Sequence, residues 1–147
     1  MSGMFAGCYS ITALDLRCFD TSNVLNMSNM FSDCSSFIML DVTSFNTSSA
    51  TNMSGMFFYC FVLNSLDLSN FRTSQVTDMS RMFYSCFDLS ELDIHNFDMS
   101  NVVDASNMFG ECASLTSIYF GDRFQYSPNA NTDGMFEGCP IHEIKQS

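Results

Sequence analysis

The sequence predicts a single right-handed α/β repeat solenoid, in which each 26-residue repeat contributes one short parallel strand and one short helix. Three observations support this fold class: a fixed period, an alternating apolar pattern and a helical apolar pattern. The period is seen in the cysteines Cys8, Cys34, Cys60, Cys86 and Cys112. It returns in the pairs Met4-Phe5, Met30-Phe31, Met56-Phe57, Met82-Phe83 and Met108-Phe109. General hydrophobicity cannot produce a fixed period, so the chain is a tandem repeat.

The first half of each repeat has the pattern of a strand. In the third repeat, Leu66 and Leu68 alternate with polar residues between Leu63 and Phe71. Alternation with a period of two turns one face of a strand inward and the other outward. A short strand is therefore expected around Leu66 and Leu68, and at the same place in the other repeats.

The second half of each repeat has the pattern of a helix. Met79, Met82, Phe83 and Cys86 lie at positions i, i+3, i+4 and i+7, which form one stripe on an α-helix. Asp78 precedes this stripe, and Asp and Asn are favoured N-caps because their side-chain oxygens accept free backbone N–H groups. The equivalent residues in the other repeats are Asn26, Asn52 and Asp104. These features predict a short capped helix.

One repeat cannot bury its own apolar face, whereas stacked repeats bury it against their neighbours. The predicted single domain, 1–147, comprises a partial repeat 1–13, full repeats 14–39, 40–65, 66–91 and 92–117, and an irregular last repeat with a C-terminal cap over 118–147. Stacking makes each inward position a ladder of like residues, here Cys34, Cys60, Cys86, Cys112, Phe45, Phe71 and Phe97. Residues 1–5 match residues 53–57, so the chain begins inside a repeat and is expected to continue into further repeats of a longer protein.

The last repeat departs from the strict period. Met135-Phe136 lies one position later than the period from Met108-Phe109 requires, whereas Ile144 is again in register with Ile118. One residue has therefore been inserted and one has later been lost. Together with Pro140, this predicts a modified final turn that ends in a polar cap.

Composition narrows the function. The formal net charge is −11, from 16 acidic and 5 basic residues. Nucleic-acid binding and attachment to an anionic membrane surface both require clustered Lys and Arg, so neither is expected. No stretch approaches the roughly 18 apolar residues of a transmembrane helix. No nucleophile elbow, phosphate loop or metal-ligand cluster interrupts the repeat, so we expect neither an enzyme nor a cofactor.

The repeat resembles that of the BspA-like leucine-rich repeat proteins, in particular the 26-residue branch of mycoplasma-type surface lipoproteins and other bacterial surface proteins. The similarity is carried by residues 66–71 and 76–86, and it is close from Met1 to about Cys112. The resemblance implies a leucine-rich-repeat-like solenoid within a larger protein. It also implies an extracellular or cell-surface location and a role in adhesion or in binding other proteins.

The cysteine ladder allows disulfides, a metal site or free thiols. Stacked repeats about 4.8 Å apart would bring neighbouring cysteines within disulfide reach. Parallel Cβ directions and an inward position oppose disulfides, and no Cys-x-x-Cys pair or histidine partner favours a metal. The sequence favours buried free thiols that act as small apolar groups. Cys18 lies outside the ladder and is expected to be exposed.

A column of aspartates is the main candidate for binding. Each lies between two inward residues of the predicted strand, so its side chain faces outward. Two interpretations stay open: the carboxylates meet a basic partner or hold Ca²⁺, or neighbouring hydroxyl and amide groups satisfy them. With the variable residues beside it, the column gives a candidate concave binding face of Asp15, Arg17, Asp41, Thr43, Asp67, Ser69, Asp93, His95 and Tyr119.

The function predicted from the sequence is a non-catalytic protein-binding or adhesion module of a larger surface protein. The alternative is a structural scaffold component packed inside a larger, intracellular assembly, because exported proteins seldom keep many free thiols. In both cases the expected partner is another protein, with no nucleic acid and no membrane insertion.

Overall fold

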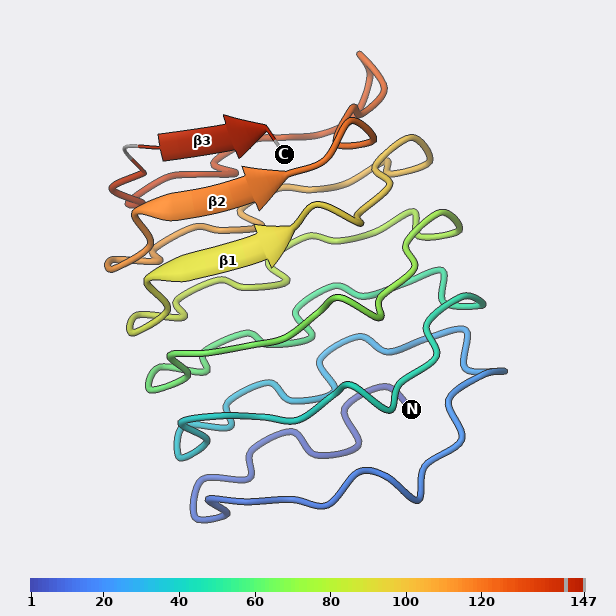
Figure 1. The fold of residues 1–147 in the computed structure, drawn as a ribbon, viewed down its shortest axis with the longest axis vertical. Coiled ribbons are helices and arrows are strands. Elements are labelled where there is room, and N and C mark those ends of the chain that lie inside the picture. The colour runs from blue at the N-terminus through green and yellow to red at the C-terminus, as the bar shows by residue number, and fades with distance from the viewer. Residues whose placement is uncertain (142, 147) are drawn as a thin grey trace.

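The computed structural model describes residues 1–141 and 143–146. The chain winds upward as a flattened spiral (Figure 1). Each full circuit of the spiral is one repeat long and lies above the previous circuit, and we call each circuit a coil. Parallel bridges join residues one repeat apart, from Asn26 to Asn52, to Asp78 and to Asp104. Most residues therefore lie beside their counterparts in the neighbouring coils.

Three short strands lie along one side of the stack. They are β1 (Glu91–Ile94), β2 (Ser117–Phe120) and β3 (Glu143–Gln146), which pair in parallel in the order β1-β2-β3. The register joins Leu92 to Ile118, and Ile94 to Phe120. In β1 and β2 alternate side chains are buried, as a half-buried strand requires. The lower coils follow the same path without strands, joined by bridges such as Met39 to Ser65.

No helix occurs in the described part of the chain, so the predicted α/β solenoid with one strand and one helix in every repeat is wrong. The residues expected to be helical form consecutive turns. The N–H groups of Met30 and Cys34 donate to the C=O groups of Met27 and Phe31, three residues earlier. Asp33, just before Cys34, has a φ of 58°, which belongs to the left-handed region and cannot continue an α-helix.

Hydrogen bonds between coils explain why turns replace the helix. The N–H groups of Asn29 and Phe31 donate to the C=O groups of Ser54 and Met56 in the next coil, at 2.8 and 2.9 Å. Alternate amides thus bond across coils, as in a sheet, while the others close turns. A helix of about two turns would be only marginally stable by itself. We call these segments, residues 27–34, 53–60, 79–86 and 105–112, the turn run.

The residues predicted to cap helices do accept a hydrogen bond from a following backbone N–H, but they form Asx turns and not helix ends. Asn26 Oδ1 accepts the N–H of Ser28 at 2.9 Å, and Asp78 Oδ1 accepts that of Ser80 at 3.0 Å. These bonds close Asx turns, in which a side-chain oxygen accepts an N–H two residues further on. The interpretation of these residues as helix caps is therefore wrong; they turn the chain at a corner of each coil.

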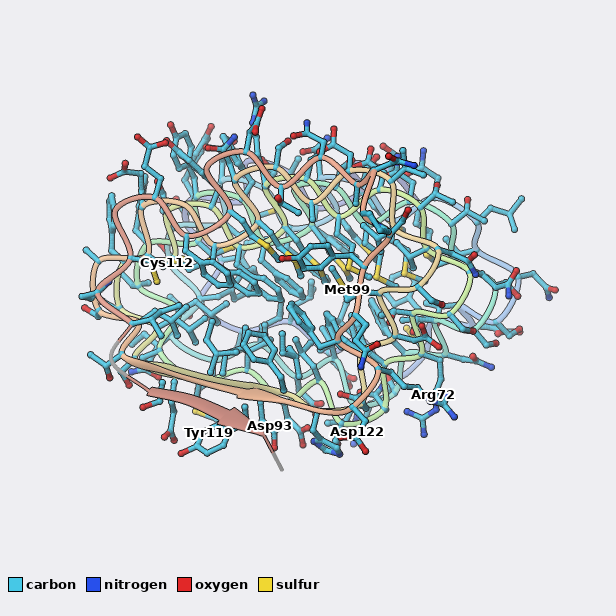
Figure 2. The ribbon with its side chains drawn as sticks, turned by 90° about the horizontal axis from the view of Figure 1, so that it is seen from above. Arg72, Asp93, Met99, Cys112, Tyr119 and Asp122 are labelled. Atoms are coloured by element: carbon cyan, nitrogen blue, oxygen red, sulfur yellow. The ribbon has the colours of Figure 1, made fainter. Side chains whose placement is uncertain are left out.

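The core fills the space between the strands and the turn run, which lie on opposite long sides of the flattened coil (Figures 1 and 2). Its centre is a stack of phenylalanine rings with neighbouring centroids 5.5, 5.8, 5.6, 5.5 and 5.2 Å apart, formed by Phe5, Phe31, Phe57, Phe83, Phe109 and Phe136. The residues named from the sequence as ladders are all buried, namely Cys34, Cys60, Cys86, Cys112, Phe45, Phe71 and Phe97.

Buried threonines clamp successive coils together. The Thr47 hydroxyl accepts the N–H of Arg72 at 2.7 Å and donates to the C=O of the same residue at 3.0 Å. Thr21 and Thr73 make the same pair of bonds to the coil above. Each hydroxyl thus satisfies two backbone groups at a position where no sheet forms.

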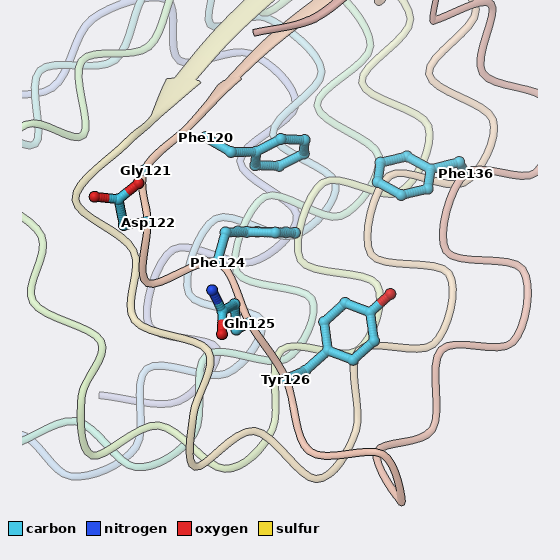
Figure 3. A pocket seen from close by; sticks show the side chains of 7 residues that line it. All are labelled: Phe120, Gly121, Asp122, Phe124, Gln125, Tyr126 and Phe136. Atoms are coloured by element: carbon cyan, nitrogen blue, oxygen red, sulfur yellow. The ribbon is translucent and has the colours of Figure 1, made fainter. Parts of the chain in front are cut away.

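The last coil contains the irregularity expected from the sequence. Asp104 pairs with Asn131, one position beyond the strict period, whereas Ser117 pairs with Glu143, which keeps that period. Beside the inserted segment, Phe120, Phe124, Tyr126 and Phe136 line a hollow of about 350 Å³ (Figure 3). Within the predicted C-terminal cap, His142 and Ser147 lie outside the described residues.

Candidate functional site

The candidate binding residues lie on the strand side of the stack. Eight of the nine are exposed and Tyr119 is half-buried. Figure 2 shows Asp93 and Tyr119 projecting from this side, beyond the strands. Neighbouring hollows of about 380, 430 and 420 Å³ follow this face and share lining residues, so they form one shallow groove. We call it the acidic groove; its lining includes Asp15, Asp41, Asp67, Glu91, Asp93 and Tyr119.

The backbone holds each aspartate of the column in the same way. Asp15, Asp41, Asp67 and Asp93 accept the N–H of the residue two positions later through Oδ1, at 3.1, 3.0, 2.9 and 3.0 Å. These Asx turns end the strand-side segment of four successive coils. The Leu-Asp pairs of the sequence therefore combine an inward leucine with an aspartate that both turns the chain and presents a carboxylate.

Side chains next to the column supply further partners. The Arg17 guanidinium bonds the Asp15 carboxylate at 3.0 and 2.8 Å, and these hydrogen bonds lower the Asp15 pKa to about 2. The Thr43 hydroxyl donates to Asp41 at 2.6 Å, and this bond is the main reason that the Asp41 pKa is lowered. His95 Nδ1 lies 2.7 Å from Asp93 Oδ1.

The Asp67 pKa is also lowered, chiefly by the backbone N–H of Ser69. Repulsion between neighbouring aspartates acts in the opposite direction but is weaker than these local bonds. The sequence left open whether neighbouring groups satisfy these carboxylates, and hydrogen bonds from neighbouring groups lower the pKa values of Asp15, Asp41 and Asp67. Three stacked carboxylates, those of Asp15, Asp41 and Asp67, therefore carry full charge at neutral pH.

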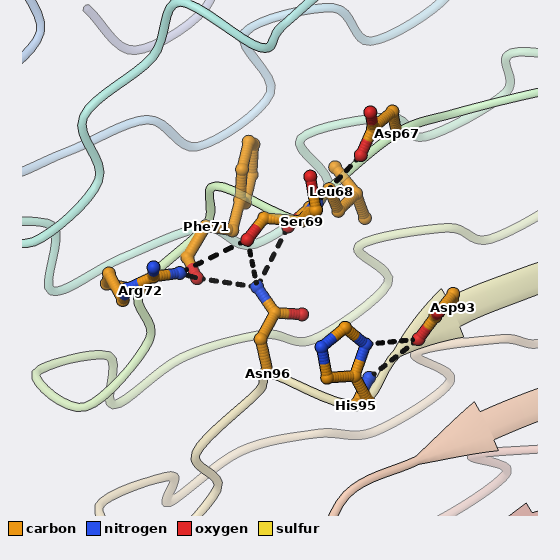
Figure 4. A network of polar contacts seen from close by, with 8 residues as sticks. All are labelled: Asp67, Leu68, Ser69, Phe71, Arg72, Asp93, His95 and Asn96. Atoms are coloured by element: carbon orange, nitrogen blue, oxygen red, sulfur yellow. Dashed lines mark hydrogen bonds and ion pairs between the residues drawn. The ribbon is translucent and has the colours of Figure 1, made fainter. Parts of the chain in front are cut away.

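Asparagines inside the corner next to the column tie the coils together (Figure 4). Asn96 Nδ2 donates to the C=O groups of Leu68, Ser69 and Phe71, at 2.9, 3.3 and 2.7 Å. Asn70 bonds the coil below it in the same manner. These residues fix the backbone behind the groove. The part of the chain that the structure describes brings no three His, Cys, Asp or Glu side chains together as metal ligands.

The four ladder cysteines, from Cys34 to Cys112, are buried hydrogen-bond donors. Cys60 and Cys86 donate through Sγ to the C=O groups of Phe31 and Phe57 in the preceding coil, both at 3.2 Å. Burial raises the pKa of the Cys60 thiol to about 12 and that of Cys86 well above its ordinary value. All seven cysteines are free, and Cys18 is exposed. Buried thiols of this kind are poor nucleophiles, because the thiolate is the reactive form.

A second surface feature was missed by the sequence reasoning. Phe58, Tyr59, Phe61, Tyr84 and Phe87 form an aromatic cluster at the end of the turn run, with ring centroids between 4.0 and 5.9 Å apart. Phe87 is exposed, and the other four are half-buried. The run Phe57-Phe58-Tyr59-Cys60-Phe61 was the available signal, since the first of these phenylalanines belongs to the core and the other aromatic residues do not.

Comparison with known proteins identifies a repeat family. The family model described as "Mycoplasma protein of unknown function, DUF285" matches residues 1–119 and, in a second overlapping match, residues 41–144. The chain belongs to the DUF285 family. Overlapping matches are expected when a family model can align with a repeat in more than one register. This DUF285 chain is therefore of the mycoplasma type that its repeat resembles.

No curated protein and no solved structure matches this DUF285 chain. The residues that the structure describes include no helix long and apolar enough to cross a membrane.

Proposed function

We propose that the chain is a non-catalytic protein-binding module of a larger surface protein, and that the acidic groove is its binding face. The observation that carries this proposal is the column of ionised aspartates along a continuous hollow. Each carboxylate is held in place by its own backbone, so little side-chain freedom is lost when a partner binds.

Charge indicates the kind of partner. A groove lined by carboxylates on a chain of net charge −11 attracts a basic protein surface and repels acidic ones. Residues beside the column differ from coil to coil, since Arg17, Thr43, Ser69 and His95 occupy equivalent positions. A column of four aspartates with variable neighbours suits recognition of one particular basic surface.

The surface location, the adhesive role and the assignment to the BspA-like leucine-rich repeats belong to the same proposal. They are supported by the resemblance of residues 66–71 and 76–86 to that repeat. Membership of a mycoplasma protein family agrees with it.

The test compares two variants with equal changes in charge. The groove variant replaces Asp15, Asp41, Asp67 and Asp93 with asparagine, which keeps an oxygen for the Asx turn, as at Asn26. The control variant replaces four exposed aspartates elsewhere with asparagine, namely Asp20, Asp88, Asp122 and Asp133. Surface plasmon resonance then measures binding of each protein to immobilised basic matrix proteins and to a decalysine peptide.

The groove variant is expected to lose binding, whereas the control variant keeps most of it. Wild-type binding should weaken as the salt concentration rises, because salt screens the attraction between charges. The Debye length is about 8 Å at physiological ionic strength and becomes shorter at higher salt. Equal losses in the two variants would show that net charge alone attracts the partner and would refute the groove as binding face.

The free, buried thiols favour a second candidate, a structural scaffold component inside a larger intracellular assembly. Labelling intact cells of the source organism with a membrane-impermeant biotin reagent distinguishes the two. A labelled protein supports the surface module, and an unlabelled protein that copurifies with a large assembly supports the scaffold.

A further inference from the structure

The aromatic cluster is not required by the repeat. The six core rings are followed at the next position by Ala6, Ser32, Phe58, Tyr84, Gly110 and Glu137. Four positions after that ring, the equivalents of Phe61 and Phe87 are Tyr9, Ser35, Ala113 and Pro140. The other coils thus fold mostly with small residues where two adjacent coils place stacked rings. These rings are additions to the repeat that lie outside its buried core.

One residue of the cluster, Tyr59, has a positive φ that is unusual for a large side chain. The turn run contains two columns of residues with positive φ, and most members are Gly, Asn, Asp or Ser. The exceptions are Tyr59, Arg81 and Glu111, with φ values of 58, 55 and 58°. Large side chains are disfavoured in this region, and strained residues of this kind concentrate at functional sites.

All three of these residues influence one side chain of the cluster, Tyr84. Tyr59, Arg81 and Glu111 all lie close enough to Tyr84 to influence its hydroxyl electrostatically. The Tyr84 ring lies across Gly110 of the next coil, where a Cβ would come within 2.8 Å of it. The absence of a side chain at Gly110 therefore leaves room for the Tyr84 ring, which also lies 5.9 Å from the ring of Tyr59.

A hollow of about 260 Å³ adjoins the cluster. Phe58 lines it together with Asn29, Ser32, Ser54, Ser80 and Arg81.

The polar groups of the hollow are available to a ligand. The guanidinium of Arg81 and the amide of Asn29 make no hydrogen bond with any described residue. The Ser54 and Ser80 hydroxyls donate to Asn52 and Asp78, which leaves their oxygens free to accept. An aromatic ring, two planar polar groups and several acceptors therefore meet in one small concave site.

We propose that this site, formed by the aromatic cluster and the adjoining hollow, binds a neutral oligosaccharide. The apolar C–H face of a sugar packs on an aromatic ring, while its hydroxyl groups bond planar polar side chains. The hollow is slightly smaller than the roughly 300–1,000 Å³ of drug-sized ligand sites, which suits a single sugar ring. Further sugars of the same chain would lie over Tyr59, Phe61 and Phe87.

The charges favour a neutral ligand over a charged one. Arg81 in the hollow repels a cation. Glu111 and Glu137 near Tyr84, with a net charge of −11, repel an anion. Hydroxyl groups avoid both penalties, because they donate to carboxylates and accept from the guanidinium.

The test is a glycan array that carries neutral oligosaccharides, including maltohexaose, cellohexaose, chitohexaose and lactose-terminated chains, beside sulfated and sialylated ones. Calorimetry with the neutral oligosaccharide that binds most strongly then compares three variants. Phe58→Ser and Tyr84→Ala introduce residues that the chain already uses at this position, Ser32 and Ala6. Arg81→Asn introduces the residue found at Asn29 and Asn107, which tolerates a positive φ.

Each variant is expected to bind the neutral oligosaccharide about tenfold or more weakly, a change that calorimetry resolves readily. The groove variant with four asparagines should bind it as the wild type does, so this result does not depend on the proposed protein partner. The proposal is overturned if the wild type binds no neutral glycan or only charged ones. It is equally overturned if Arg81→Asn, which keeps a favourable backbone, leaves binding unchanged.

Discussion

Replacing Thr47 with valine tests how the coils are held together. The two side chains have almost the same shape, so the substitution removes the hydroxyl and leaves the packing volume unchanged. Thr47 is completely buried, and its hydroxyl bonds both the N–H and the C=O of Arg72 in the coil above. In the valine variant both backbone groups lose their partner.

The magnitude follows from those two bonds. A typical hydrogen bond contributes about 1 kcal/mol net, and a buried backbone group left without a partner costs about 1–3 kcal/mol. Because the Arg72 side chain is exposed, water can partly reach its backbone, so the expected loss is about 3 kcal/mol for the pair. For a domain of this size the melting temperature should fall by about 6–12 °C.

Urea unfolding followed by circular dichroism measures the free energy directly, with Thr43→Val as the matched control. Thr43 is exposed and its hydroxyl bonds only Asp41, so this variant should change the free energy of unfolding by less than about 0.5 kcal/mol. Should the Thr47 and Thr43 variants unfold at the same urea concentration, the clamp would contribute nothing and the account of coil stacking would be wrong.

Three further predictions follow from the described contacts. At pH 8, iodoacetamide should label the exposed Cys18 rapidly and Cys60 only after unfolding, because burial raises the Cys60 pKa to about 12. Mass spectrometry of the labelled native protein measures this, and a modified Cys60 would contradict it. Asp15 has a folded pKa of about 2, below its ordinary value of 3.8, so its contribution to stability is complete above about pH 4 and disappears as the pH falls towards 2. Asp15→Asn should accordingly lower the melting temperature much more at pH 7 than at pH 2, and an equal difference at both pH values would rule out this linkage. Gly121→Ala should destabilise by about 3 kcal/mol or more, because the new Cβ would lie 1.9 Å from the His95 carbonyl oxygen; an unchanged melting temperature would show that the backbone there moves freely.

The repeat and its buried positions could be predicted from the sequence because they depend on spacing alone. A cysteine or phenylalanine that recurs at the same place in every repeat must stack on its counterpart, whatever the backbone between them does. The ladders Cys34–Cys112 and Phe45–Phe97 are accordingly buried. The extra residue of the last coil was likewise visible in the interval between Met108 and Met135.

The helix could not be excluded from the sequence, because two different backbones direct the same residues inward. Met27, Met30, Phe31 and Cys34 would form a stripe on a helix, and they also lie inward in paired turns. The distinguishing information was Asn29 and Gly55 at one column of left-handed residues, with Gly7 and Asp33 at the next. A Gly, Asn or Asp every fourth residue is unfavourable in a helix interior and favourable in a turn.

The candidate face could be placed from the sequence, whereas its chemistry could not. Alternation put Asp41 and Asp67 outside, and they are exposed in the acidic groove. Their hydrogen bonds to Thr43 and Ser69 depend on a turn that no apolar pattern encodes. The aromatic cluster was not predicted from the sequence, because phenylalanine is most often a buried core residue.

The amides that bond from one coil to the next have a consequence for the gene. Every coil offers the one above it the same donors, hydroxyls and rings that it receives from the one below. An in-frame duplication of one repeat therefore inserts a coil that already fits both neighbours, and a deletion brings together two coils that already match. Length can change by recombination without any new packing being selected, while the exposed positions of each added copy are free to diverge.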